Sequence, residues 1–478
     1  MPLPQRARDR IRNLVGRAAV KLQKTVHYDD PQVIHQYRVY EGIIACRQRT
    51  INEKEHLLNE KEHIINEKDS VISHKNDVIS AREATIKSYG EYTDTVFEAG
   101  KRGKDFVEYK ENHITFTDED VKPVACYLTQ FHAIPENDEW WGKGFTEWTN
   151  VTKSMPLFRG HHQPQLPLET FYDLSSIEVM KRQVELAKNY GIYGFMFHYY
   201  WFSGKRLLEK PLENLIKTKD GLDFPFCINW ANHSWTRVWD ASEDDVLMEQ
   251  VHSEEDDLAC IADISRYLTD DRYIKINGKP IISIFNPTHL PNPNKTISIW
   301  RDYCRRQGIG EIHIVGMDNH VWDPLIYSFD GGIAQSPHDI GMHKIGAGFG
   351  EELIKTRTSV NGKTICHISD MEKYISEKMY LRDGRDKLYR GIIPSFDNSA
   401  RRSNGVSIKE VKPEFYREWL YDILQSAKKT HESGNRFIFI NAWNEWAEGA
   451  HLEPDRRYGY AYLQATADAV LAARRGET

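Results

Sequence analysis

The sequence predicts an α/β fold, a (β/α)₈ TIM-type barrel preceded by a long N-terminal helix of coiled-coil character. Two observations predict this architecture. From about residue 121 onward, eight short apolar runs alternate with amphipathic segments, as in parallel strands joined by helices. Before them, apolar residues recur at every seventh position, as in a coiled coil. A doubly wound parallel sheet is the alternative interpretation of the strand pattern.

Residues 1–40 form a basic amphipathic segment. Strong positive charge comes from Arg6, Arg8, Arg10, Arg12, Arg17, Lys21 and Lys24. The apolar residues that share one face of a helix are Ile11, Leu14, Val15, Ala18 and Leu22. Such a helix can lie on an anionic membrane surface. It can equally remain a solvated basic arm, which is the interpretation we favour.

Residues 41–92 carry a heptad repeat. One apolar column is unbroken: Ile44, Ile51, Leu58, Ile65, Ile72, Ile79 and Ile86. Three residues later, where a zipper has an apolar residue, the chain has Lys54, Lys61, Lys68, Lys75 and Arg82. We interpret the segment as a coiled-coil stalk that holds a homo-oligomer together, with a solvated single helix laced by Glu–Lys pairs as the alternative. Residues 93–120 follow as a linker.

Eight strand candidates define the predicted catalytic domain, residues 121–478. They are Val121–Phe131, Tyr193–Tyr200, Phe224–Trp230, Pro280–Phe285, Ile312–Met317, Gly332–Gln335, Gly391–Phe396 and Phe437–Ala442. A hairpin is also predicted within Tyr273–Phe285, because Asn277-Gly278 is a two-residue turn signal.

In such a barrel the functional residues lie just past the C-terminal ends of the strands. The candidate substrate-binding residues are His132, Trp141, Glu147 and Trp148 after the first strand, His198, Tyr199, Tyr200 and Trp201 at the second, Trp230, Asn232, Trp239 and Asp240 at the third, Asp397 after the seventh, and Trp443, Asn444 and Trp446 after the last. Ten of the twelve tryptophans lie in these post-strand segments. This concentration predicts a cleft walled by aromatic rings, whose faces bind the apolar faces of sugars.

Glu445 and Glu448 are the candidate catalytic residues, three positions apart after the last strand. In a continuing strand their side chains would face opposite sides. In a helical turn their Cβ atoms would lie about 5–6 Å apart, and retaining glycoside chemistry needs carboxyl groups roughly 5–5.5 Å apart. We therefore predict a turn over residues 444–448, in which one acid carries a proton and the other stays ionised.

Composition restricts the class of protein. A formal net charge of −7 and a pI near 6.3 argue against nucleic acid as a partner. No apolar run approaches the roughly 18 residues of a transmembrane helix, and the N-terminus lacks the apolar centre of a signal peptide. Six cysteines without CxxC or CxH spacing indicate buried free thiols in a reducing compartment. We predict a cytoplasmic protein, with peripheral contact at the inner face of the membrane if the basic segment binds lipid.

Neither a metal nor another cofactor is predicted. His132, His198 and His338 are isolated and lack the close ligand spacing of a metal site. An acidic run at residues 118–120 precedes the first strand, and a glycine-rich run at residues 346–350 follows no strand. A conventional metal-dependent sugar transferase therefore finds little support.

Six segments carry a resemblance to a known family: YLTQFHAIPENDEWWGKGFTEWTNV, QPQLPLETFYDLSS, YGFMFHYYWFSGKRLLEKPL, CINWANHSWTRVWD, PSFDNSARR and INAWNEWAEGAHLEPD. The chain resembles the WbsX-type proteins of bacterial surface-polysaccharide gene clusters, described as glycosyltransferases, whose fold is similar to glycoside hydrolase family 99. That resemblance implies that Glu445 deprotonates a sugar 2-hydroxyl and that Glu448 acts as acid and then base. It does not cover the stalk. His233 departs from the family pattern, which usually has glutamate there.

The residues and the resemblance together predict an enzyme of lipopolysaccharide O-antigen or capsule biosynthesis. Its substrate is an oligosaccharide or lipid-linked glycan, and it transfers a glycosyl group through a retaining two-carboxylate site. The alternatives are an endo-acting, α-mannosidase-like hydrolase and a non-catalytic carbohydrate-binding protein. The residues do not decide between transfer and hydrolysis, because a retaining site serves either one depending on which acceptor attacks.

Overall fold

The structure, a computed structural model, describes residues 10, 13–14, 17, 31–157, 160–237, 242–318, 327–334, 354–360, 363–368, 376, 378–381, 387–402, 406–407 and 412–476. The chain divides into two compact units, Met1–Gly90 and Glu91–Thr478. Most of the basic segment predicted at residues 1–40 lies outside the described residues. So do Trp239 and Asp240.

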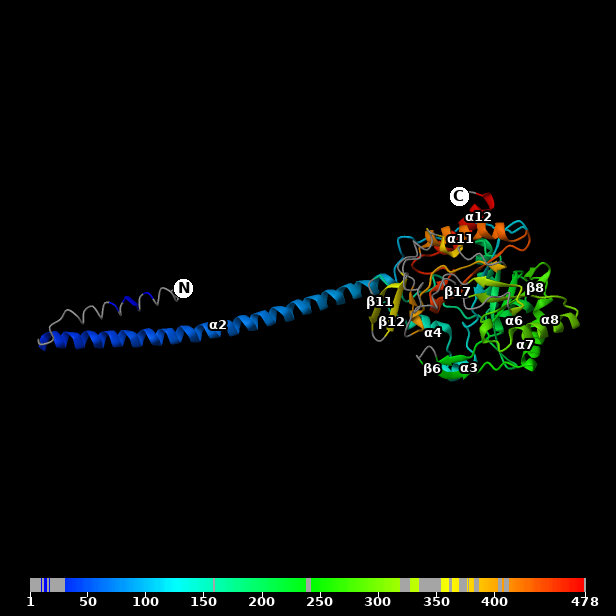
Figure 1. Cartoon of the computed structure of the whole chain (residues 1–478). Coiled ribbons are helices and arrows are strands. Elements are labelled where there is room, and N and C mark those ends of the chain that lie inside the picture. Colours follow the sequence, from blue (N-terminus) through cyan, green and yellow to red (C-terminus); the bar gives the residue numbers. More distant parts are fainter. Residues whose placement is uncertain are drawn as a thin grey trace. The chain divides into compact units, whose positions relative to one another are not determined.

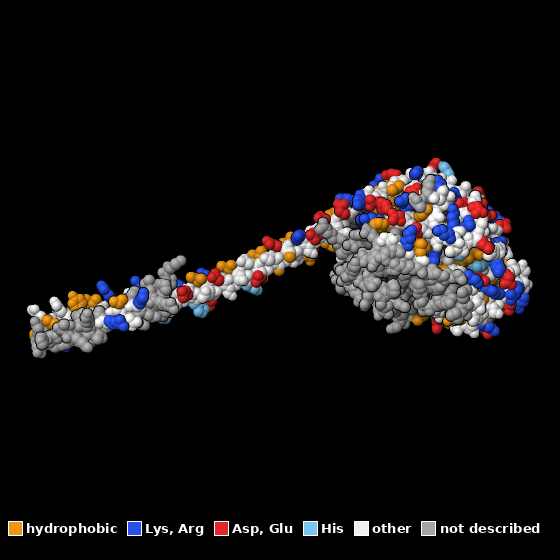
Figure 2. All heavy atoms as spheres, turned by 45° about the horizontal axis from the view of Figure 1, so that its top comes forward, with side chains coloured by type: hydrophobic (Ala, Val, Ile, Leu, Met, Phe, Trp, Pro, Cys, Tyr) orange, Lys and Arg blue, Asp and Glu red, His pale blue; other side chains and the backbone are white. Residues whose placement is uncertain are grey.

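Helix α2 runs from Pro31 to Ala99 (Figure 1). The long N-terminal helix is thus confirmed, and it exceeds the predicted heptad segment at both ends. The main apolar column remains in solvent, because its seven residues are 43–70% exposed. Figure 2 shows apolar side chains spaced along the helix. The prediction that this column contacts a second copy stays a prediction.

The second unit is built around a sheet of parallel strands. In sheet order these are β13 (Leu388–Tyr389), β10 (Gly331–Ala334), β9 (His313–Asp318), β8 (Lys279–Ile284), β4 (Phe226–Trp230), β2 (Gly194–Phe202), β1 (Lys122–Tyr127), β16 (Phe437–Ile440) and β14 (Gly391–Ile392). Every neighbouring pair in this path is parallel. All eight strand candidates of the sequence are present in it.

The two edge strands belong to one stretch of chain. Only Arg390 separates β13 from β14. β13 pairs with β10, while β14 pairs with β16 at the other end of the path. This stretch therefore brings both ends of the sheet together, which confirms the barrel over the doubly wound sheet. A Cβ atom on Gly391 would collide with the backbone oxygen of Ala334, so this closing strand needs glycine.

Helices cover the barrel and connect its strands (Figure 1). They are α3 (Pro135–Trp141), α4 (Glu147–Thr152), α5 (Ile177–Asn189), α6 (Lys210–Lys217), α7 (Glu254–Leu268), α8 (Pro293–Arg306), α11 (Pro413–Thr430) and α12 (Ala461–Arg475). Each longer helix buries one stripe, as α7 does with Cys260, Ile261 and Ile264. No helix in the described parts is long and apolar enough to span a membrane.

The remaining elements are short. The strands are β3 (Lys205–Leu207), β5 (Trp235–Arg237), β6 (Ser242–Met248), β7 (Lys275–Ile276), β11 (Ile354–Val360), β12 (Lys363–Ile368), β15 (Val406–Ser407), β17 (Asn444–Glu445) and β18 (Ala450–His451). The 3₁₀ helices are η2 (Pro287–His289), η6 (Met379–Leu381), η7 (Asn398–Ala400) and η8 (Trp446–Glu448). The predicted hairpin is confirmed: β7 pairs antiparallel with β8 through Asn277 and Gly278, whose φ angles of 51° and 74° fit a tight hairpin turn.

Candidate active site

The two candidate acids lie in a compact turn after β16. Glu445 ends β17, Glu448 ends η8, and Gly449 follows in the left-handed conformation with φ 58°. The predicted turn is thus present over Trp446–Glu448, whereas Asn444 and Glu445 pair with β18 as a short strand. Asn444 fixes its start, because its side-chain amide exchanges two hydrogen bonds with the backbone of Leu128, at 2.8 and 3.0 Å.

The segment after β14 holds the far end of the turn. The backbone N–H of Asp397 donates to the carbonyl of Glu448 at 2.6 Å, and Ser395 Oγ donates to the carbonyl of Gly449. A Cβ atom at Gly449 would lie 2.7 Å from Gln165 Nε2. Glycine is therefore required here both for its backbone angle and for space.

Arg401 brings three carboxylates together. Its Nη1 lies 3.1 Å from Glu147 Oε1 and 3.8 Å from Glu445 Oε2. Its Nη2 forms an ion pair with Glu448 Oε1. The Arg401 side chain is 14% exposed and that of Glu147 is 0% exposed, so these charges meet largely out of water. The two candidate acids thus face one guanidinium, a partner that the sequence analysis did not select.

With three carboxylates around one guanidinium, the pKa values of these groups differ from their ordinary values. Burial, together with the nearby charge of Glu448, raises the pKa of Glu445 to about 8, and Arg401 opposes both effects. Burial also raises the pKa of Glu147, against the opposing effect of Arg401. Burial alone would lower the pKa of Arg401, but the three carboxylates raise it, so Arg401 stays a cation. Glu445 can therefore hold a proton near neutral pH.

His198 and Tyr200 of β2 complete this group. His198 Nε2 lies 3.9 Å from Glu445 Oε1, and burial lowers the pKa of His198 to about 4, so its imidazole is neutral. The rings of His198 and Tyr200 are stacked, with centroids 6.2 Å apart. The Tyr200 hydroxyl accepts a hydrogen bond from Gln130 Nε2 at 3.0 Å. Nearby, burial also lowers the pKa of His233 to about 4.

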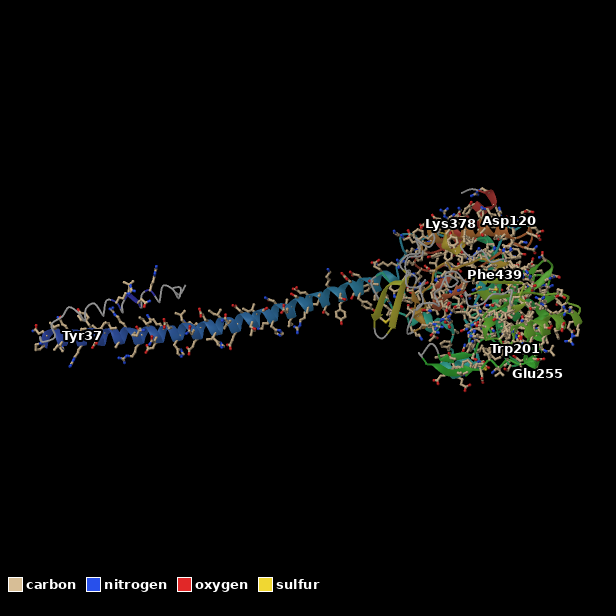
Figure 3. All side chains as sticks on the ribbon, viewed as in Figure 1. Tyr37, Asp120, Trp201, Glu255, Lys378 and Phe439 are labelled. Atoms are coloured by element: carbon tan, nitrogen blue, oxygen red, sulfur yellow. The ribbon has the colours of Figure 1, made fainter. Side chains whose placement is uncertain are left out.

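The structure does not bring three predicted binding residues to this site. Tyr199 donates to Asp263 of α7, and Trp201 Nε1 donates to Asp256 of α7 at 2.8 Å. Figure 3 labels Trp201 close to Glu255, near the start of that helix. Trp230 packs on Trp300 of α8, with ring centroids 5.4 Å apart. Neighbouring residues of a strand face opposite sides, so these side chains face the outer helices.

The remaining predicted residues support the site's walls or lie apart from it. Trp443 and Trp446 are buried and bonded to Glu453 through their indole nitrogens. Trp148 donates to the backbone of Tyr172 at 2.8 Å and packs 5.6 Å from Trp446. These tryptophans pack the protein interior, which differs from the predicted aromatic wall of an open cleft.

Four further candidates have partners of their own. Asn232 exchanges hydrogen bonds with the backbone of Asn286, at 2.7 and 2.8 Å. Asp397 accepts from His161 Nε2 at 2.5 Å. Burial lowers the pKa of His132, whose charged neighbours are Asp173, Glu209 and Lys210 rather than the acids of the turn. Trp141 packs against Phe145, with centroids 5.9 Å apart.

Arg401 was missed by sequence reasoning as a site residue. Arg401 lies in the segment PSFDNSARR, five residues after the seventh strand candidate ends at Phe396, so the position rule that selected Asp397 could have found it. Among the described residues, no group of three histidine, cysteine, aspartate or glutamate side chains is arranged to hold a metal ion. The carboxyl groups of Glu445 and Glu448 are able to accept and donate protons.

The sequence model of the family described as glycosyltransferase WbsX matches residues 123–466, which confirms the family predicted from the motifs. A protein of Xanthomonas campestris pv. campestris strain B100, described as uncharacterized protein WxcX, is 42% identical over 354 residues. The same identity is found for WxcX of strain ATCC 33913. The match covers 73% of this chain, which spans about half (50%) of the length of these curated relatives.

Two solved structures are also similar to this chain. Both are the GH99 endo-α-mannosidase from Bacteroides thetaiotaomicron, one of them in complex with BIS-TRIS-propane. Their TM-scores are 0.46 with the additive and 0.47 without it, at 14% and 12% identity. Each comparison covers 76% of this chain and 99% of the other.

Proposed function

Because the chain belongs to the WbsX glycosyltransferase family, we propose that it is a carbohydrate-active enzyme of bacterial surface-polysaccharide biosynthesis. It transfers a glycosyl group through Glu445 and Glu448. The observation that carries this proposal is the pair of acids in one turn, both against the guanidinium of Arg401. A retaining mechanism needs two close carboxyl groups in different protonation states, and the raised pKa of Glu445 supplies that difference.

The roles of the two acids follow from their surroundings. The resemblance assigns deprotonation of the 2-hydroxyl to Glu445 and acid–base catalysis to Glu448. Burial, however, raises the pKa of Glu445 to about 8, which favours its protonated form near neutral pH. Under the family assignment, substrate binding must remove this proton before Glu445 can act as a base. A base of high pKa accepts a proton more readily than an ordinary carboxylate.

A substrate with an activated leaving group separates the roles. Such a group needs no protonation, so it restores leaving-group release, the first step, to a variant lacking the acid and not to one lacking the base of that step. Under the family assignment, Glu448→Gln is rescued by an activated glycoside and Glu445→Gln is not. Rescue of E445Q alone reverses the assignment.

Transfer is the proposed reaction, and hydrolysis is the alternative. The two reactions are distinguished by incubating the protein with the host's lipid-linked glycan intermediates and measuring the molecular masses of the products. Transfer extends a glycan by a sugar unit, whereas hydrolysis yields fragments that have gained water. If the wild type and both glutamine variants bind the glycan equally and none changes its mass, the protein is a non-catalytic binding protein.

The N-terminal helix suggests how the enzyme is held. The exposed apolar column of α2 supports a homo-oligomer formed by these helices, and the basic segment supports contact with anionic lipid at the cytoplasmic face. Co-sedimentation of the full chain with vesicles tests the second point. A lipid-binding segment would pellet with phosphatidylglycerol vesicles at low salt and not at high salt, whereas the solvated arm that we favour would not pellet. No pelleting at low salt removes the membrane contact.

A further inference from the structure

Glu453 is a buried carboxylate that the proposed chemistry does not use. Its Oε1 accepts hydrogen bonds from Gln183 Nε2 at 2.6 Å and from Trp443 Nε1 at 3.0 Å. Its Oε2 accepts from the Tyr172 hydroxyl at 2.6 Å and from Trp446 Nε1 at 2.7 Å. Each oxygen thus receives two donors, which uses all the acceptor positions that a carboxylate has.

The donors belong to the segments that hold the catalytic turn. Trp443 and Trp446 flank Glu445 along the chain. The Tyr172 oxygen also lies 3.4 Å from Asn444 Nδ2, so it contacts the residue that fixes the start of the turn. A displacement of Glu453 would therefore be transmitted to the turn from both sides.

The network also reaches the barrel wall. Gln183 lies on α5, and its Oε1 accepts a hydrogen bond from the Tyr127 hydroxyl of β1 at 2.6 Å. Glu453 is thereby connected through buried side chains to a strand and a helix that do not carry the acids. Buried networks of this kind hold a single arrangement when every member has a partner.

Only an ionised carboxylate fits the four donors. Burial raises the pKa of Glu453 to about 7, while the four side-chain hydrogen bonds favour the charged form. A glutamine in its place would direct an amide N–H₂ at two of the donors, whichever way the amide is turned. At least one indole would then lose its acceptor and have to move.

We propose that Glu453 is a positioning residue of the active site, which fixes the indoles of Trp443 and Trp446 and through them sets where Glu445 and Glu448 lie. Its effect on turnover rests on the proposed function. Its effect on the geometry of the turn does not, so the two are tested separately.

The first test is structural and needs no substrate. Crystal structures of the wild type, Glu453→Gln and the control Asp257→Asn are compared. Asp257 is also a buried carboxylate, with its pKa raised to about 6 by burial, and it accepts from Thr296 at 2.7 Å outside the barrel. We expect the Glu445 and Glu448 carboxyl groups to shift by more than about 0.5 Å in E453Q, the tolerance of a catalytic constellation, and to stay in place in D257N. Carboxyl groups unmoved in E453Q would overturn the proposal.

The second test measures turnover of the lipid-linked glycans. A misplacement of about 1 Å can lower the rate 100-fold, so kcat of E453Q should fall by about that factor with KM nearly unchanged. The loss should also be non-additive: E448Q/E453Q should be no slower than E448Q, because both changes act on the same step. A kcat in E453Q equal to that of D257N contradicts the positioning role.

Tyr172→Phe provides a milder variant if E453Q does not fold. It removes one of the four donors and leaves the carboxylate in place. We expect a smaller shift of the turn and a smaller loss of kcat than in E453Q, and an unmoved turn counts against the proposal. If the wild type turns over no glycan, the proposed function fails, while the crystal structures still decide whether Glu453 positions the turn.

Discussion

Replacing Arg401 with methionine removes the guanidinium that faces Glu147, Glu445 and Glu448. Methionine has a similar length and is apolar, so space is conserved and charge is lost. Breaking a buried ion pair by removing one partner costs about 3–5 kcal/mol, because the other charge remains buried and uncompensated. Since Arg401 faces three carboxylates and is 14% exposed, we expect a loss of about 4–5 kcal/mol of unfolding free energy at pH 8. Urea unfolding followed by tryptophan fluorescence measures it.

The difference in unfolding free energy between the wild type and R401M should become smaller as the pH falls. Without Arg401 the pKa values of Glu147 and Glu445, which burial already raises, rise further above the roughly 4.3 of an unfolded glutamate. Between these values the folded state binds more protons than the unfolded state, so the unfolding free energy of R401M increases as the pH is lowered from 8 to 5. We expect the difference from the wild type to fall by at least half over that range.

Arg206 provides the matched control. It is 13% exposed and pairs with Glu213 at 2.9 Å and Asp263 at 3.2 Å, against α7 and away from the turn. Arg206→Met should lose stability as well, yet it should keep glycan turnover, which R401M abolishes. An R401M protein as stable as the wild type at pH 8, or a deficit that is the same at pH 5, would refute the charge argument.

Three further predictions follow from the structure. Because the pKa of Glu445 is raised to about 8, the unfolding free energy of the wild type should fall more steeply from pH 5 to pH 8 than that of Glu445→Gln. The difference in slope is at most about 1.4 kcal/mol for each pH unit. Equal slopes of unfolding free energy against pH, measured by urea unfolding, contradict this. Gly449→Ala should lower the unfolding free energy more than Gly434→Ala. An alanine at either position has about 1–2 kcal/mol of backbone strain from the positive φ, but only the Cβ at position 449 meets neighbouring atoms. Equal midpoints of urea unfolding for the two variants contradict this. Ile72→Asp should reduce the mass of the oligomer measured by light scattering, whereas Asn66→Asp, which lies off the apolar column of α2, should not. An unchanged mass for I72D contradicts the predicted contact between copies of the stalk.

The fold could be predicted because its signals are local. A buried parallel strand appears as a short apolar run, and Asn277-Gly278 has a turn chemistry that permits few alternatives. The bounds of α2 were less predictable, because residues beyond the heptad segment show no repeat yet continue the helix from Pro31 to Ala99. Helix ends depend on local capping and on packing rather than on periodicity.

The candidate site was predicted in part. The turn with Glu445 and Glu448 follows from spacing, but their partner Arg401 lies in another loop, and nothing in the spacing of the two acids points to it. Tyr199 and Trp201 were selected with His198 because they follow one another in sequence, although β2 directs alternate residues outward. Their partners on α7, Asp263 and Asp256, are recognisable only once the helix is placed against the strand.

The pairing of β1 with β16 has a consequence for protein synthesis. Glu147 is translated soon after β1, whereas both acids of the turn are translated only after β16. Until then the nascent chain has neither the complete barrel nor the two residues that would act on a sugar. A product terminated before β16 would therefore lack both acids of the turn and, under the proposed function, would not act on glycan precursors.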